Sequence, residues 1–242
     1  MVALIFRHLA TRPGVLDWIW NAVGPAWRSG RLQEAARRVA RTAPLEPTVK
    51  IPRAALRAWG VDDAGEREIH DVLVAYNRAN PENMLTMLCV LRLLKDDRGR
   101  VPIDSIQHSA WSAPRAPGPL APMADITKLP REVLDLLDLV SAPGEPGAPR
   151  VVQSLYRHFC HRPAFLAGIV TLLRARFDDG SIGRAVAAIH VAMSHEADAI
   201  ASTLSAPPAP DASIEATCAR FANAVIPQMI VAGRLVEEAL PA

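Results

Sequence analysis

The chain has 242 residues, a formal net charge of +2 and a hydrophobic fraction of 50%, so it can bury the core of one or two compact domains. Positive and negative residues are interspersed and no basic stripe stands out, which argues against nucleic acid as a partner. Only 5% of the residues are aromatic, and alanine and leucine dominate the apolar set, a composition that favours packed helices over sheets.

In the first half, apolar residues recur at helical spacing after Pro13, and Gly30 is the expected C-terminal cap of that helix. Pro25 is expected to kink or shorten it. Asn80 precedes Pro81 and is the expected N-cap of a new helix. Further helices are predicted at residues 32–41, 52–59, 62–78 and 82–94.

Residues 96–150 are predicted to be a proline-rich linker with one helix at 130–139. The prolines of this stretch are Pro102, Pro114, Pro117, Pro119 and Pro122. In the second half, helices are predicted after Pro163 and at 182–204, 213–224 and 228–240. No pair of alternating strands is visible, so the predicted fold class is all-α.

Three cysteines, Cys89, Cys160 and Cys218, form no CxxC pair and are expected to be buried, reduced thiols. The N-terminal apolar run is too short for a signal peptide, and no apolar stretch is long enough to span a bilayer. The expected location is therefore the cytoplasm, without a membrane partner.

One segment occurs twice, 150 positions apart: Phe6–Leu16 aligns without a gap on Tyr156–Leu166. From Arg7 to Ala35 eight of 29 positions are identical, where chance gives about two at average composition. Two copies are too few for a solenoid. The sequence therefore predicts a first helical repeat at 1–95 and a second at 151–242, packed as a pseudo-dimer about an approximate two-fold axis, with any ligand pocket between them.

The segments Arg7–Leu16, Asn80-Pro81 and Ser154–Leu166 resemble the group I 2-haloacid dehalogenases, which handle both D and L substrates. The resemblance covers nearly the whole chain and implies an all-helical fold of two repeats joined by a long linker. It implies hydrolysis: an aspartate in the second repeat activates a water, which displaces halide from the carbon next to a carboxylate. It implies no cofactor and no metal.

The sequence departs from this family where the base should lie. The family has a Ser-Asp pair followed by an aromatic residue and arginine, whereas this chain reads Ser154-Leu155-Tyr156-Arg157. Leu155 cannot accept a proton, and losing a general base reduces a rate by about 10²–10⁴-fold. Family residues upstream of the first repeat are also missing, because that repeat begins almost at Met1. The candidate substrate contacts implied by the resemblance are Asn80 and Ser154–Arg157.

Other residues offer weaker alternatives. The doubled pairs Arg7-His8 and Arg157-His158 favour structural hydrogen bonds over anion binding by one arginine, because a catalytic group serves one pocket. His158 with His161, and His190 with His195, lack a metal-binding signature. Asp178-Asp179 before Gly180 are expected to form a turn.

Two functions therefore stay open. One is a hydrolase acting on a small 2-substituted carboxylic acid with an altered base. The other is a non-catalytic relative that binds a small acid or an apolar ligand between the repeats. A polar pocket with a carboxylate would favour the enzyme, and a dry, leucine-lined cavity would favour the binder. The sequence also allows a homodimer.

Overall fold

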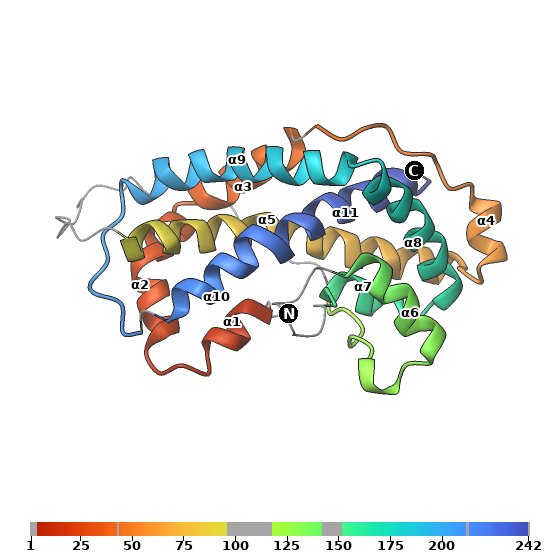
Figure 1. Ribbon diagram of the computed structural model, residues 1–242, viewed down its shortest axis with the longest axis horizontal. Helices are drawn as coiled ribbons and strands as arrows, with labels where there is room; N and C mark the ends of the chain where they lie inside the picture. The colour runs from red at the N-terminus through yellow and green to blue at the C-terminus, as the bar shows by residue number, and fades with distance from the viewer. Residues whose placement is uncertain (1–3, 43, 96–117, 142–151, 212, 242) are drawn as a thin grey trace. The chain divides into compact units, whose positions relative to one another are not determined.

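The computed structural model describes residues 4–42, 44–95, 118–141, 152–211 and 213–241, and every regular element within them is helical (Figure 1). The fold class is all-α, as predicted. The first part contains α1 (Leu4–Leu9), α2 (Val15–Arg28), α3 (Arg31–Thr42), α4 (Arg53–Ala58) and α5 (Asp63–Lys95). After a 3-10 turn, η1 (Ile126–Lys128), come α6 (Arg131–Val140), α7 (Ser154–Phe159), α8 (Pro163–Asp178) and α9 (Ser181–Ala201). The chain ends with α10 (Ile214–Arg220), the π-helical η2 (Phe221–Val225) and α11 (Ile226–Ala239).

The sequence repeat is also a repeat of local structure. α7 and α9 begin 150 positions after α1 and α3. The turns before α3 and α9 contain Gly30 and Gly180 with φ of 77° and 75°, a left-handed conformation that glycine adopts without strain. Both glycine amides donate to the carbonyl three residues earlier, Trp27 and Phe177. The duplicated residues thus encode the same helix–turn–helix backbone twice.

The compact units of the structure are not the two repeats. The first unit contains Met1–Ala43, Arg78–Ala116 and Ala188–Pro227, and the second contains Pro44–Asn77, Pro117–Ala187 and Gln228–Ala242. Each unit holds one copy of the duplicated segment and adds residues from the other repeat. Helices α5, α9 and α11 contribute residues to both units. The predicted two-fold axis between the repeats stays a prediction.

The arginine of the duplicated motif performs a matching task in each unit. In the first unit, Arg12 Nη1 lies 2.7 Å from Asp211 Oδ2 and also donates to Ser213 Oγ, just before α10. In the second unit, Arg162 donates to Glu68 Oε2 in the first turns of α5. Each arginine therefore binds the beginning of a helix that belongs to the other repeat.

Helix α5 corrects one prediction of the sequence. The helices expected at 62–78 and 82–94 form one helix that passes through Pro81 (Figure 1), so Asn80 lies inside it and is no N-cap. Proline removes one backbone donor, at a cost of about 3 kcal/mol in a helix interior. In the first unit this helix is central: its residues from Asn80 to Leu91 are all buried. Burial on all sides of the helix offsets the cost of the proline.

The corresponding region of the second repeat is also continuous. The helices expected at 213–224 and 228–240 are joined by η2, and Pro227 lies in the first turn of α11. A π-helical turn is a usual way of accommodating a residue that cannot complete the i→i−4 ladder. Asn77 and Asn223 stand four residues before the two prolines, and both bond to neighbouring side chains: Asn77 Nδ2 to Glu237 at 2.8 Å, and Asn223 Oδ1 to His190 at 2.8 Å.

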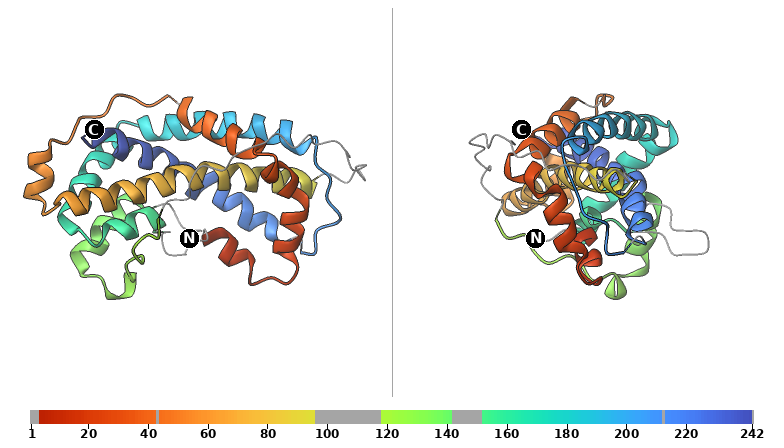
Figure 2. Two further views of the ribbon diagram at one scale, coloured as in Figure 1. Left: turned by 180° about the vertical axis from the view of Figure 1, so that it is seen from behind. Right: turned by 90° about the vertical axis from the view of Figure 1, so that its left-hand side faces the viewer.

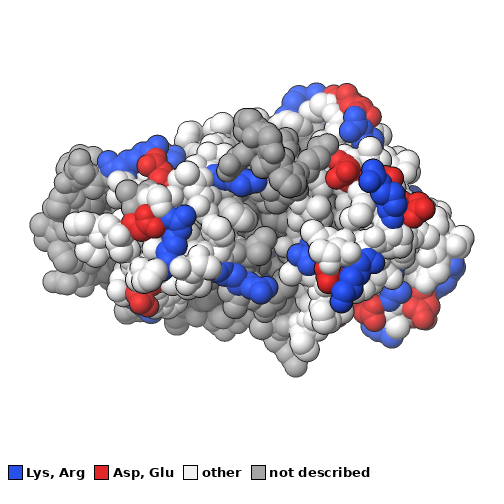
Figure 3. All heavy atoms as spheres, turned by 60° about the horizontal axis from the view of Figure 1, so that its bottom comes forward, with Lys and Arg blue, Asp and Glu red and all other residues white. Residues whose placement is uncertain are grey.

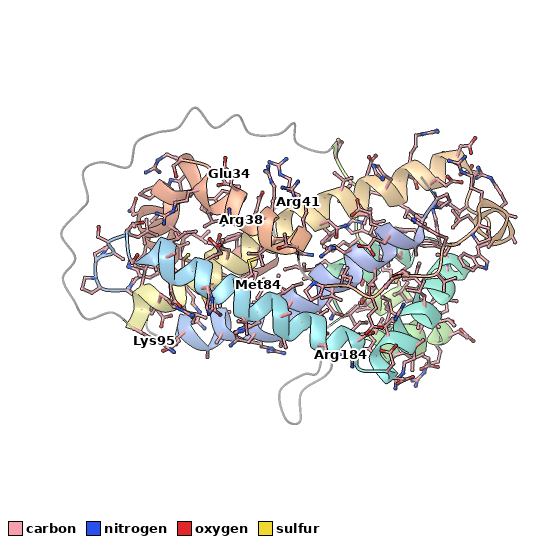
Figure 4. The ribbon with its side chains drawn as sticks, turned by 90° about the horizontal axis from the view of Figure 1, so that it is seen from above. Glu34, Arg38, Arg41, Met84, Lys95 and Arg184 are labelled. Atoms are coloured by element: carbon pink, nitrogen blue, oxygen red, sulfur yellow. The ribbon has the colours of Figure 1, made fainter. Side chains whose placement is uncertain are left out.

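The remaining helices follow the predicted pattern. One exception is Pro25, which does not shorten its helix as expected, because α2 runs past it to Arg28. The short α4 and the linker helix α6 are present as predicted. α3 buries its apolar face, while Glu34, Arg38 and Arg41 lie along its exposed side (Figure 4). α6 and α7 both pack on α8 within the second unit, as Figure 1 and the view from behind in Figure 2 show. The linker prolines Pro102, Pro114 and Pro117 lie outside the described residues.

The surface carries both charge signs. Lys and Arg alternate with Asp and Glu over the face drawn in Figure 3. In the described part of the chain, no helix combines the length and the apolar character that a membrane crossing requires.

Candidate functional site

The four candidate residues of the second repeat lie on α7, in the second unit. The first of them, Ser154, opens the helix after the extended backbone of Gln153. Leu155 and Tyr156 are 0% and 1% exposed. Phe159, at the end of α7, meets Phe165 of α8 edge-to-face, with ring centroids 5.2 Å apart. Aromatic pairs of this geometry stabilise by about 0.5–1.5 kcal/mol beyond the area they bury, so α7 is firmly anchored on α8.

Arg157 is engaged by the backbone of the linker. Its Nε and Nη2 donate to the carbonyl oxygen of Ala124 at 3.1 and 2.9 Å, and the amide of Ala124 donates to the carbonyl of Arg157 at 3.2 Å. This two-way contact fits the structural role favoured for the doubled Arg-His pair. The resemblance also implies that Arg157 contacts the substrate. Two donors of its guanidinium are already directed at the carbonyl of Ala124.

His158 is the exceptional polar side chain of this region. It is 6% exposed, and neither ring nitrogen has a hydrogen-bond partner among the described residues. Leaving a buried polar atom unpaired costs about 1–3 kcal/mol, so the structural hydrogen bonding expected for the doubled histidine is not found here. Burial lowers the pKa of His158, and the charges of His161 and Arg157 lower it further. The imidazole is therefore neutral at pH 7 and can accept a proton.

Tyr76 of α5 fixes the orientation of that imidazole. The two rings meet edge-on, with centroids 5.6 Å apart and planes inclined by 63°. Burial raises the pKa of Tyr76 to about 12, against the opposing effects of a hydrogen bond with Ser154 and the charge of Arg157. Tyr76 thus stays protonated at neutral pH and keeps its hydroxyl as a hydrogen-bond donor. Ser154, Tyr76 and His158 form one polar cluster inside the second unit.

Gln153 extends this cluster toward α11. Its Nε2 donates to Gln228 Oε1 at 3.1 Å, while its own Oε1 is buried without a partner among the described residues. Gln153 is 2% exposed. With His158, it gives the α7 region both an unpaired acceptor oxygen and two unpaired ring nitrogens.

Asn80, the fifth candidate, lies on α5 in the first unit. It is 4% exposed, and its Nδ2 has no partner among the described residues. Nearby on α5, Glu82 lies 3.4 Å from Arg37 and 3.7 Å from Arg78. Burial raises the pKa of Glu82, and the two arginines oppose that change. Asn80 thus lies in a stretch of helix with unusually many buried polar groups.

The other sequence candidates are structural. Cys89, Cys160 and Cys218 are free and buried as expected, and burial raises the pKa of each thiol, to about 12, 11 and 12 respectively, which disfavours the nucleophilic thiolate. Asp179 Oδ1 accepts the amide of Ser181 at 2.8 Å, so it has the turn role predicted. Within the described residues, no three His, Cys, Asp or Glu side chains gather as a metal site requires.

Sequence reasoning did not identify Tyr76, Gln153 or the unpaired state of His158. Tyr76 carries no motif, because only tertiary packing brings α5 beside α7. Gln153 directly precedes Ser154, but its contact with Gln228 of α11 appears only in the fold. For His158 a signal existed: it stands three positions after Leu155, so both side chains lie on the same face of the helix.

Among the comparisons with known proteins, the one with solved structures identifies the fold. No protein-family model matches the chain, and no curated protein matches it by sequence. A solved structure of a D-2-haloacid dehalogenase mutant in complex with D-2-CPA resembles it with a TM-score of 0.64 and 16% sequence identity. The match covers 98% of this chain and 84% of the other. The chain therefore shares its overall fold with this D-2-haloacid dehalogenase.

Proposed function

We propose that the chain is a hydrolase of the group I 2-haloacid dehalogenase type, in which His158 replaces the missing aspartate as the base that activates water. The substrate is a small carboxylic acid with a leaving group on the adjacent carbon. The fold likeness and the Ser154–Arg157 pattern support the reaction class. One observation carries the assignment of the base: His158 is buried with both ring nitrogens unpaired by the described residues, on the same face of α7 as Leu155.

The imidazole meets the chemical demands of the step. Its lowered pKa keeps it neutral at pH 7, and its contact with Tyr76 restricts its rotation. His158 takes a proton from water as the water oxygen bonds to the substrate carbon. The carbon–halogen bond breaks and the halide leaves with the electron pair. The imidazolium then returns its proton to solvent.

The test is halide release from D- and L-2-chloropropionate. We expect release by the wild type and a rate about 10²–10⁴-fold lower in His158→Gln, the usual contribution of a general base. His8→Gln is the matched control, because His8 holds the same place in the first repeat and is exposed. Its rate should equal that of the wild type. Equal rates in His158→Gln and the wild type would disprove the role of His158.

Leu155→Asp distinguishes a changed base from a lost one. If the wild type is inactive and Leu155→Asp releases halide, the pocket is intact and its base is lost. If all variants are inactive, dehalogenation is not the function. Any stereochemical preference follows from the ratio of the two chloropropionate rates.

The second candidate is a non-catalytic relative that binds a small acid or an apolar ligand. The full burial of Leu155 favours it, because a buried leucine at the place of the family's base cannot assist hydrolysis. Saturable binding of 2-chloropropionate without halide release, measured by calorimetry, would support this reading.

A further inference from the structure

The second unit contains a cleft of about 660 Å³ away from the residues of the proposed hydrolase site. Its walls come from the segment before α4, α4 itself, the first turns of α5 and the end of α11. The volume lies within the range of small-molecule sites. It shares no lining residue with the cluster formed by Tyr76, Ser154 and His158.

The cleft has an apolar floor. Its partly exposed apolar residues are Leu240 and Pro241, and Leu56, Ile69 and Leu73 contribute buried side chains. An apolar group of four or five carbons seated there would be removed from water, which favours its binding. The floor alone would admit any small hydrophobic ligand, so the charges at the rim decide the class.

Four charged side chains stand at the rim without an ion pair among the described residues: Lys50, Arg67, Asp71 and Glu237. Lys50 Nζ lies 3.4 Å from the carbonyl oxygen of Leu240, and Glu237 Oε2 accepts Asn77 Nδ2 at 2.8 Å, so both are held at the rim by neutral partners.

The remaining ionic group of the lining is already neutralised. The carboxylate of Glu66 lies 3.1 Å from Arg57 and 3.6 Å from Arg53. His70 also lines the cleft and is exposed, so its ring can add a hydrogen-bonding group. The rim therefore offers two cations and two anions, and its net charge is zero.

The geometry points to a binding site for a small zwitterion with an apolar side chain, the chemistry of an apolar α-amino acid. The ligand's carboxylate meets Lys50 and Arg67, its ammonium meets Asp71 and Glu237, and its side chain covers Leu240 and Pro241. A ligand with only a carboxylate would leave Asp71 and Glu237 without a cation. A ligand with only an ammonium group would leave Lys50 and Arg67 without an anion.

The experiment is isothermal titration calorimetry of the full chain with L-leucine. Two matched probes each lack one charge: 4-methylpentanoate has no ammonium, and 3-methylbutylamine has no carboxylate. We expect leucine to bind once per chain and each probe to bind at least about tenfold more weakly, the equivalent of about 1.4 kcal/mol. No saturable heat with leucine, or an affinity for either probe equal to that for leucine, would overturn the proposal.

Variants locate the binding in the cleft. Arg67→Gln and Glu237→Gln should each weaken leucine binding about tenfold. Arg131→Gln, an equally exposed change on α6 of the same unit, should leave it unchanged. Arg67 is exposed and has no ion pair among the described residues, so its variant should fold normally, which thermal unfolding checks. Unchanged affinity in both cleft variants would place any leucine site elsewhere. Halide release does not enter this test, so it can fail or succeed independently of the proposed hydrolase.

Discussion

Trp18 and Gly168 hold the same place in the two copies of the repeated segment, yet they differ by a whole indole ring. In the first unit Trp18 is 5% exposed, and its Nε1 donates to the carbonyl of Pro207 at 2.7 Å. In the second unit Trp59 of the first repeat covers Gly168: a Cβ there would lie 2.5 Å from Cη2 of the ring. Each unit thus has one tryptophan ring at this position. In the first unit the ring belongs to Trp18 of the repeated segment itself, and in the second unit it belongs to Trp59, which comes from the other repeat. Packing conserves volume, not the position in the sequence that supplies it.

The largest expected effect on stability comes from removing the indole ring of Trp18. Trp18→Ala should lower the free energy of unfolding by about 3–5 kcal/mol, because a buried ring and its hydrogen bond are lost together. Trp59 is only half-buried, so Trp59→Ala should cost less. Urea unfolding of both variants measures the difference. Equal losses would mean that the two units do not pack their tryptophans differently.

The second test concerns the glycine that admits the other indole. Gly168→Ala should destabilise by about 1–3 kcal/mol, because the new methyl overlaps the Trp59 ring. Gly183→Ala on α9 is the control: a Cβ there meets nothing within 4 Å, and alanine should stabilise the helix by about 0.8–1 kcal/mol. In the double variant Gly168→Ala/Trp59→Ala the cost of the new methyl should vanish. A neutral Gly168→Ala single variant would contradict the packing described here.

The smallest of the three effects compares the doubled histidines. His8 is exposed, whereas His158 is buried with a lowered pKa. Below about pH 6.5 the unfolded chain binds a proton at His158 that the folded chain does not bind. The free energy of unfolding therefore decreases as the pH is lowered, until the pH reaches the pKa of His158 in the folded chain. Unfolding at pH 7.5 and 5.5 should show this loss in the wild type and in His8→Gln, and a smaller loss in His158→Gln. An identical pH dependence in all three would show that His158 titrates normally.

The helices and turns that the sequence predicted correctly are those that depend on interactions between residues close together in the chain. The pattern placed α2, α3, α8 and α9 correctly, and Gly30 and Gly180 lie in the turns that end α2 and α8, because a left-handed turn favours glycine whatever surrounds it. The all-helical class followed from composition and periodicity. The interruption expected at Pro81 was wrong, because the cost of an unpaired carbonyl is local whereas residues 80–91 of this helix are buried by packing against distant parts of the chain.

For the candidate site, the sequence determined the position of Ser154–Arg157 and the absence of a carboxylate at Leu155. Only the tertiary structure showed that His158 is buried beside Tyr76, that Arg157 binds the linker backbone, and that each compact unit takes helices from both repeats. The physical reason is the range of the interactions. Helix caps and hydrophobic periodicity act over a few residues and can be read from a sequence, whereas an unpaired imidazole or a glycine covered by a distant tryptophan depends on residues tens of positions away.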